Sequence, residues 1–341
     1  MRAVATLLLC VGLCWVSWPL WLWGVWHAVW SPDLTACEAA RGVGACWGVI
    51  AEKHRVILWG RYPYEEQWRA LCASLIMVSL VVHAARPASW RRSLIPVVGA
   101  GAVSVWVLMS GRFMGISLAS LGLPPVATDL WGGLALTLML AIASIALAFP
   151  LSIALALGRR SKWPVLKALC AGLIEWVRGV PLVSVLFMAS FMLPMLLPPG
   201  QTPDVWWRVL GALVLFLAAY LAEVIRGGLQ GVSEGQHMAA TALGLTPWQC
   251  QRHVLLPQAL RYSLPAMVNH FIGLFKDTSL VTIVSMYELS GALNLALSGD
   301  ANWRPFKIEA YLFIALIYFC FCFSLSTYSQ RWQQRLAHHA P

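Results

Sequence analysis

Long uncharged apolar runs, separated by short polar connections, dominate the sequence. A helix needs about 20 predominantly apolar residues to cross the roughly 30 Å hydrocarbon core of a bilayer. Eight runs predict such helices, and they span 4–28, 70–86, 93–111, 130–157, 176–198, 205–225, 262–286 and 307–328. The first run exceeds the roughly 7–15 apolar residues of a signal peptide, so we expect a retained membrane helix. The pattern predicts an all-α, multi-pass membrane protein with about eight transmembrane helices.

The predicted helices fall into two blocks. Residues 1–127 hold three of them, together with an outer loop at 33–69, and form an N-terminal extension. Residues 128–330 hold the other five helices and nearly all of the unusual motifs. Residues 331–341 form a tail, which we expect to lie in the cytoplasm.

Composition agrees with this fold class, and charge sets its orientation. Hydrophobic residues make up 60% of the chain and charged residues only 11%, whereas soluble domains have about 25% charged residues. A net charge of +10 raises the question of a nucleic-acid partner, but most basic residues gather on one face of the predicted topology. They are Arg2, Arg86, Arg91, Arg92, Arg159, Arg160, Lys162, Lys167, Arg226, Arg252, Arg261, Arg331 and Arg335. This is the positive-inside pattern, so we expect cytoplasmic termini and no nucleic acid.

Nine cysteines occur without a C-x-x-C spacing, so no zinc or redox motif and no metal site are expected. Most lie in predicted membrane helices, where cysteine acts as a small apolar residue. Cys37 and Cys46 differ, because both fall on the outer loop. An oxidising compartment would permit a disulfide between them, and two free thiols remain the alternative.

A helical hairpin is predicted at 233–257, within the longest inner connection between membrane helices. Ser233 followed by Gln236 fits a capping box, so a first helix should begin beside them. Gly244 supplies the left-handed position that ends this helix. The helix carries small residues, which let another surface approach its backbone closely; they are Ala239, Ala240 and Ala242.

The second half of the hairpin has its own start and stop signals. Thr246 followed by Gln249 fits another capping box, with Pro247 at the first helical position. Pro257 should end this helix, because proline cannot continue it. The hairpin suits either a partner's groove or an amphipathic position on the membrane surface, and both interpretations stay open on these signals.

The hairpin resembles a motif in the transmembrane subunits of binding-protein-dependent ABC importers. That motif reads E-A-A, three residues, G, nine residues, I-x-L-P. This chain has Met238-Ala239-Ala240, Gly244 and Val254-Leu255-Leu256-Pro257 with every interval kept. Met238 replaces the motif glutamate, so any salt bridge of that glutamate is lost. The resemblance implies a coupling helix that docks into a separate ATPase through Gly235, Met238, Ala239, Ala240, Gly244, Val254, Leu256 and Pro257.

Further stretches are similar to the polar-amino-acid branch of that family. They are Gly132–Ser161, Glu175–Phe187, Ala222–Val232 and Lys276–Leu289. Together with the hairpin they cover roughly residues 130–330. The first 127 residues resemble the extension of the M-type permease of the general L-amino-acid transport system, including ACWGVI and RYPYEEQWR. This resemblance implies a type I ABC importer fold in the second block and import of a broad range of amino acids.

The resemblance also implies partners. They would be an ABC ATPase subunit, a sister permease subunit and a periplasmic amino-acid-binding protein at the bacterial inner membrane. No G-x-x-x-x-G-K-[ST] loop occurs in the chain, so ATP would be bound by the separate ATPase. We therefore expect no cofactor and no enzymatic activity in this chain.

Two charged residues interrupt a predicted membrane helix. Lys276 and Asp277 lie roughly 20 Å from the inner end of the run that includes them. Charge in hydrocarbon is expensive, so this pair, with Thr278, is a candidate part of the translocation path. The alternative is that Lys276 extends to the outer surface while Asp277 caps a helix break at Thr278.

Glu175, Arg178 and Glu288 are further candidates for the translocation path. An amino acid carries both charges, so a path lined by a few paired charges suits it chemically. The alternative for Glu175 and Arg178 is an i, i+3 pair that satisfies itself on a helix near the inner surface.

Two other classes of function fit the sequence less well. A secondary, ion-coupled amino-acid transporter is the leading alternative. Such proteins often have paired halves with matching broken helices, and no second copy of the Gly132–Leu289 pattern is present. A membrane-embedded enzyme would need His or carboxylate clusters at ligand spacing, and the sequence has none. ATP-driven uptake separates the importer from the secondary transporter.

Overall fold

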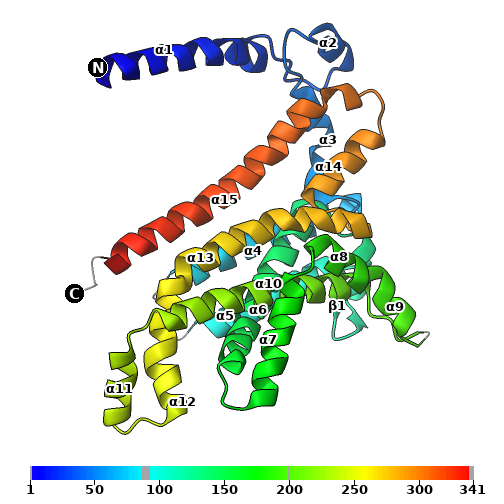
Figure 1. The fold of residues 1–341 in the computed structure, drawn as a ribbon. Coiled ribbons are helices and arrows are strands. Elements are labelled where there is room, and N and C mark those ends of the chain that lie inside the picture. Colours follow the sequence, from blue (N-terminus) through cyan, green and yellow to red (C-terminus); the bar gives the residue numbers. More distant parts are fainter. Residues whose placement is uncertain (1, 87–92, 199, 338–341) are drawn as a thin grey trace.

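The chain is mostly helical, and a computed structural model describes residues 2–86, 93–198 and 200–337 (Figure 1). Within these residues, four helical stretches are long and apolar enough to cross a membrane, namely Tyr64–Ala84, Gly133–Arg159, Val205–Gln230 and Arg304–Gln334. They contain α4 (Gln67–Ala84), α6 (Gly133–Arg159), α10 (Val205–Gln230) and α15 (Lys307–Ala337). Apolar composition over these lengths predicts membrane helices, and the structure places helices there.

The remaining predicted runs are also helical, but two of them are not straight. The first and third runs form α1 (Arg2–Trp21) with η1 (Leu22–Trp26), and α5 (Leu94–Ser110). The fifth run, 176–198, is not one straight helix. It contains the last residues of α7 (Pro164–Arg178) and the stretch Leu182–Leu196, and these two helices are bent by 104° relative to each other, because Pro181 cannot continue α7. The seventh run begins as α13 (Leu256–Asp277) and tightens into the 3-10 helix η8 (Thr278–Val284).

Shorter elements connect these helices. After the bend, Leu182–Leu196 consists of α8 (Leu182–Phe187), η6 (Met188–Met192) and α9 (Leu193–Leu196). The other short elements, on the side that the sequence predicts to be the outer one, are α2 (Leu34–Ala39), α3 (Gly48–Trp59), η2 (Tyr64–Glu66), the antiparallel pair β1 (Arg112–Phe113) and β2 (Ile116–Ser117), η4 (Ala119–Leu121), η5 (Thr128–Leu130), α14 (Leu289–Ser298) and η9 (Arg304–Phe306). The hairpin consists of α11 (Glu234–Ala242), α12 (Pro247–Cys250) and η7 (Gln251–Leu255).

The core of the bundle lies between α6, α10 and α13. α6 packs along α10, and α10 packs along α13. Fully buried apolar side chains fill the contact between them, including Leu136 and Leu140 of α6 and Leu213, Leu221 and Ile225 of α10. In a membrane such contacts stabilise mainly by close packing, since lipid is as apolar as leucine.

Glycines let the N-terminal extension touch the second block backbone to backbone. Gly60 ends α3, and a Cβ added to it would lie 2.6 Å from the Cα of Gly132. Gly133 has a φ of 60°, and a Cβ there would overlap the carbonyl of Leu58. Only glycine combines this left-handed conformation with the absence of a side chain. The start of α6 is therefore fitted against the end of α3.

Buried polar groups hold the extension together beside this contact. Arg69 is fully buried, and its Nε and Nη1 donate to the carbonyl oxygens of Leu108 and Pro124 at 2.6 and 2.8 Å. The hydroxyl of Tyr62 donates to the carbonyl oxygen of Met109 at 3.0 Å. Burial raises the pKa of Tyr62 to about 12, so the phenol remains a donor near neutral pH. These bonds join α4 to the end of α5.

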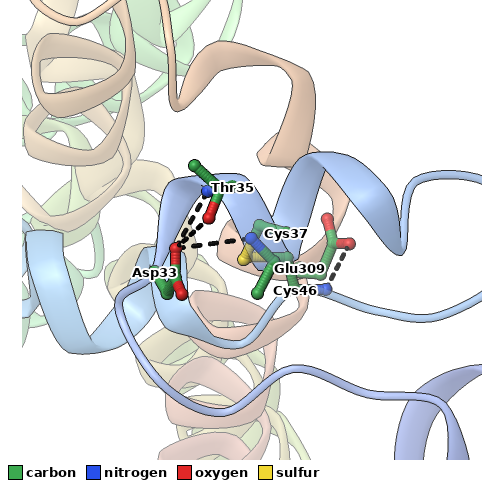
Figure 2. Close-up of a disulfide and its surroundings, with 6 residues drawn as sticks. Asp33, Thr35, Cys37, Cys46 and Glu309 are labelled. Atoms are coloured by element: carbon green, nitrogen blue, oxygen red, sulfur yellow. Dashed lines mark hydrogen bonds between the residues drawn. A yellow bond between two sulfur atoms is a disulfide. The ribbon is translucent and has the colours of Figure 1, made fainter.

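A small outer unit, formed by α2, the loop after it and α3, packs against α14 and the start of α15. Cys37 and Cys46 are fully buried in it and form a disulfide. Figure 2 shows the backbone N–H of Cys46 donating to a carboxylate oxygen of Glu309 on α15, at 3.1 Å. Asp33 caps α2, and the hydroxyl of Thr35 is the main cause that lowers the pKa of Asp33. The disulfide thus lies where the outer unit meets α15.

Loss of the disulfide is expected to loosen this unit. Cys37→Ser should destabilise it by about 2–3 kcal/mol, because the bond closes a short loop in the unfolded chain. Mass spectrometry of unreduced protein, alkylated under denaturing conditions, should find neither thiol modified. Alkylation of both thiols would contradict the bond. Cys72→Ser is the control, since Cys72 is a free cysteine of α4.

Candidate functional site

The hairpin turns at Gly244, as the sequence predicts. α11 ends in two backbone hydrogen bonds, from the N–H of Gly244 to Thr241 at 2.9 Å and from the N–H of Leu245 to Ala240 at 3.2 Å. Gly244 has a φ of 78°. This pair of bonds around a left-handed glycine is a Schellman motif. It stops the first helix and reverses the chain within two residues.

The capping predictions have different outcomes at the two helix starts. Thr246 and Gln249 form the predicted capping box, because each side chain bonds the backbone of the other. The box predicted at Ser233 is wrong, since the Ser233 side chain makes no capping hydrogen bond. α11 instead begins with the N–H of Gln236 donating to the carbonyl of Ser233 at 3.0 Å.

The prediction that Pro257 ends the second helix is also wrong. α12 continues through the π turn η7 (Gln251–Leu255) directly into α13. Pro257 directly follows the π turn, where the local widening of the helix accommodates the proline ring and its missing N–H. α12, η7 and α13 therefore form one continuous helical stretch from Pro247 to Asp277.

The motif residues divide between two faces of the hairpin. Ala240, Cys250 and Leu255 are buried where α11 packs against α12 and η7, and Val254 and Leu256 are half-buried beside them. The other motif residues are exposed, namely Gly235, Met238, Ala239, Gly244 and Pro257. Three large apolar side chains are exposed at 62%, 83% and 63%, and they are Met238, Leu243 and Trp248. The two arms of the hairpin therefore pack on each other and present large apolar side chains on the outside.

Five charged side chains meet where α6, α7 and α10 end, next to the hairpin. Glu223 of α10 is the centre, with its carboxylate 3.4 Å from Arg159, 3.9 Å from Arg178 and 3.0 Å from Nε of Arg226. Arg159 also contacts Glu175 at 2.8 Å. Glu175 and Arg178 thus do not pair with each other, and each bonds to another helix. Glu223 is not among the site residues predicted from the sequence, although its i, i+3 spacing to Arg226 indicates an ion pair on one helix face.

Neutralising Glu223 is expected to destabilise the bundle more than neutralising Glu175. Glu223→Gln would leave three guanidinium groups close together in a partly buried place and should cost about 1–2 kcal/mol. Glu175→Gln should cost about 0.5 kcal/mol or less, since its side chain is 64% exposed and has one partner. Thermal unfolding of both purified variants measures this order. Equal effects would contradict the central position of Glu223.

Glu288 is fully buried at the start of α14. Its Oε1 accepts the backbone N–H groups of Ser290 and Gly291, both at 2.9 Å. Its Oε2 accepts the hydroxyl of Tyr318 on α15 at 2.9 Å, and Thr137 on α6 lies at 3.4 Å. The carboxylate therefore caps α14 and joins it to two other helices. Its predicted part in a translocation path stays a prediction.

Lys276, Asp277 and Thr278 mark the point where α13 becomes η8. Lys276 is exposed and Asp277 is half-buried. The side chain of Asp277 does not cap η8, and the hydroxyl of Thr278 donates to the carbonyl of Phe275 at 2.8 Å. The alternative in which Asp277 caps a helix break is therefore wrong. The structure brings the three residues to a change of helix type, within one continuous stretch from the hairpin.

Comparison with known proteins places this geometry in a family. Residues 148–338 match the model of the binding-protein-dependent transport system inner membrane component. The matched residues include the hairpin, Glu223 and Arg226 of α10, and η8. The chain belongs to this family. The permease is therefore a multi-pass inner-membrane subunit of an importer, whose family implies a separate ATPase and a binding protein as partners.

Two relatives are similar over nearly the whole permease. The inner membrane amino-acid ABC transporter permease protein YhdY of Escherichia coli (strain K12) is 42% identical, over 96% of this chain and 88% of the relative. The glutamate/glutamine/aspartate/asparagine transport system permease protein BztC of Rhodobacter capsulatus is 36% identical, over 97% and 88%. The family model begins only at residue 148. Because the two alignments cover nearly the whole chain, they also include the N-terminal extension.

A solved structure supports the fold of the permease. It is described as the crystal structure of an amino acid ABC transporter with histidines, and it has 30% identity and a TM-score of 0.53. The alignment covers 60% of this chain and 92% of that one. The type I importer fold predicted for the second block is thereby confirmed. Among the described residues, no group of three His, Cys, Asp or Glu side chains could hold a metal ion.

Proposed function

We propose that the permease imports a broad range of polar amino acids, in a complex with a sister permease chain and a separate ATPase. The observation that carries this proposal is the hairpin, whose motif intervals, Gly244 turn and exposed apolar tip are all suited to docking. The amino-acid substrate is supported by the long relatives, one named for amino acids and the other for glutamate, glutamine, aspartate and asparagine.

The hairpin would act as the coupling element. Met238, Leu243 and Trp248 are exposed together, and such side chains gain most when they enter a partner's apolar cleft. Because α12 continues through η7 into α13, a displacement of the hairpin would be passed on to α13. α13 ends at Lys276 and η8, where the sequence predicts the translocation path. Closure of the ATPase would thus reach the path along one helical stretch, in which the π turn and Pro265 are the points that can bend.

The candidate path residues occupy two levels in this arrangement. Lys276, Asp277, Thr278 and Glu288 lie near η8 at the far end of α13. Glu175 and Arg178 lie at the hairpin end, within the Glu223 charge cluster. We propose that the first group borders the path of the amino acid, whereas the second group holds the inner ends of the helices together between transport steps.

Both termini and the hairpin are proposed to face the cytoplasm. The positive-inside asymmetry supports this orientation. Figure 1 also places the N-terminal end of α1, the C-terminal end of α15 and α11–α12 on the left of the bundle, with α2, β1 and α9 on the right.

Cysteine labelling tests the orientation. A cysteine at exposed Ala242 should resist an impermeant maleimide in intact cells and react after permeabilisation. The matched control is Ser117→Cys, since Ser117 is exposed on β2 and should react in intact cells. Labelling of Ala242→Cys from outside would contradict the proposed orientation.

Substrate range and sister permease are tested on the purified complex and in cells. Deletion of the permease should reduce uptake of labelled glutamate, glutamine, aspartate and asparagine, and other polar amino acids should compete. Mass spectrometry of the complex should identify a second, non-identical permease chain beside the ATPase. Uptake of one amino acid alone would contradict the broad range, and a complex with this permease chain only would contradict the sister subunit.

A further inference from the structure

A cavity of about 700 Å³ lies at the opposite end of the bundle from the hairpin. α6 and α10 both begin beside it and end near the hairpin. Its wall combines Arg61 of the extension, Trp106 of α5, Trp206 of α10 and Ser285 at the end of η8. The volume suits a small molecule. The extension thus completes the wall of a cavity whose other sides belong to the second block.

The charged residues of the cavity are balanced. Arg61, Arg112, Asp129 and Asp204 all line it. Both carboxylate oxygens of Asp204 already accept hydrogen bonds within the protein, from the backbone N–H of Trp206 at 2.8 Å and from the hydroxyl of Thr128 at 2.7 Å. Within the described part of the chain, the carboxylate of Asp129 and the guanidinium of Arg112 have no ion-pair partner.

Arg61 is held in place with donors to spare. Its Nη2 donates to the carbonyl oxygen of Asp129 at 2.7 Å, and its guanidinium lies 5.1 Å from the ring centre of Tyr287. A guanidinium has five N–H donors in a fixed fork that matches a carboxylate. The cavity therefore offers cations and a carboxylate close together, which favours a ligand that carries both charges.

A buried donor in the same wall lacks a partner. Trp206 is 3% exposed, and its indole N–H has no acceptor among the residues that the structure describes. Trp206 packs against Trp106 with ring centres 5.4 Å apart and against Trp131 at 6.1 Å. The indole nitrogen is enclosed by protein atoms, so it does not face the cavity. The rings of Trp106 and Trp206 instead form an aromatic wall beside the charged groups.

We propose that this cavity binds a free amino acid as a zwitterion, on the face opposite the hairpin. Arg61 would bind the carboxylate, and Asp129 would bind the ammonium group. The site rests on the proposed amino-acid import, and it places a first stop for the cargo outside the predicted path at Lys276. It also gives the extension a role, because Arg61 belongs to it.

Equilibrium binding of tritiated L-glutamine to the complete purified complex, without the binding protein, tests this site. We expect saturable binding that Arg61→Gln and Asp129→Asn each weaken about tenfold, as for loss of one hydrogen bond to a charged group. Arg41→Gln is the matched control, because Arg41 is exposed on the outer unit away from the cavity. Asp129→Asn is the safest variant, since the Asp129 side chain makes no structural bond.

Two analogues separate the halves of the site. Glutaramic acid lacks the ammonium group and 4-aminobutanamide lacks the carboxylate, so each should compete about tenfold less well than L-glutamine. Absence of saturable binding, or binding unchanged in both variants, would overturn the site. If wild-type cells still import amino acids in that case, only the site fails. Loss of ATP-driven import in the wild type would instead remove the proposed function.

Discussion

Replacement of Gly244 by valine is expected to reduce ATP-driven uptake at least about tenfold, because left-handed backbone costs a β-branched residue about 1–2 kcal/mol or more. Gly244 has a φ of 78° at the end of α11. Relief of that strain would open the Schellman motif and tilt α11 against α12. The tilt would displace Met238 on α11 relative to Trp248 on α12. The membrane helices are remote from the turn, so the permease should reach the membrane at normal abundance while losing the ATPase. Uptake and co-purification of the ATPase measure both effects.

The control for Gly244→Val is asparagine at the same position. A Cβ at Gly244 meets no atom within 4 Å, so both variants fit sterically and differ mainly in backbone strain. Asparagine tolerates the left-handed conformation, and Gly244→Asn should retain most of the uptake. Met238→Ala should also have the smaller effect, because it shortens one exposed side chain without moving the backbone. Equal loss in the valine and asparagine variants would show that the turn conformation is not the cause.

Gly133→Ala is expected to be the most destabilising single-methyl substitution proposed for the permease, at about 3 kcal/mol or more. The added Cβ would overlap the Leu58 carbonyl, and the φ of 60° adds strain. Both effects push the end of α3 away from the start of α6, and with it Arg61 at the cavity. Thermal unfolding of the purified complex and the amount of folded permease measure the loss.

Gly172→Ala is the matched control for this substitution. Gly172 lies within α7, and a Cβ there meets nothing within 4 Å. Alanine should be neutral or stabilise the helix by up to about 1 kcal/mol. A Gly133→Ala permease as stable as the control would mean that the extension does not pack against α6 as described.

Local signals in the sequence predicted the local features of the hairpin. Gly244 and the Thr246 capping box act through the backbone of their own neighbours, so their residue types suffice. Ser233 has the right residue type as well, yet its side chain makes no cap, because the backbone N–H can bond the Ser233 carbonyl instead. Pro257 is tolerated because a π turn precedes it, and no single residue type signals such a turn.

Contacts between distant segments were beyond the sequence pattern. Glu223 meets Arg159 and Arg178 because three helices end at one level, and helix rotation and tilt depend on packing rather than on apolar length. The contact between Gly60 and Gly132 likewise depends on the path of two loops. The cavity is beyond the sequence pattern for the same reason, since Trp131 and Trp206 are far apart in the sequence and are buried together.

We propose that ATP hydrolysis by a separate subunit drives this permease to import amino acids. Proteoliposomes with the complete complex test this coupling, with ATP enclosed, the binding protein outside and labelled L-glutamine as the substrate. We expect accumulation that requires both ATP and the binding protein and that persists when ionophores dissipate all ion gradients. Accumulation that follows an imposed proton or sodium gradient without ATP would contradict it and identify a secondary transporter.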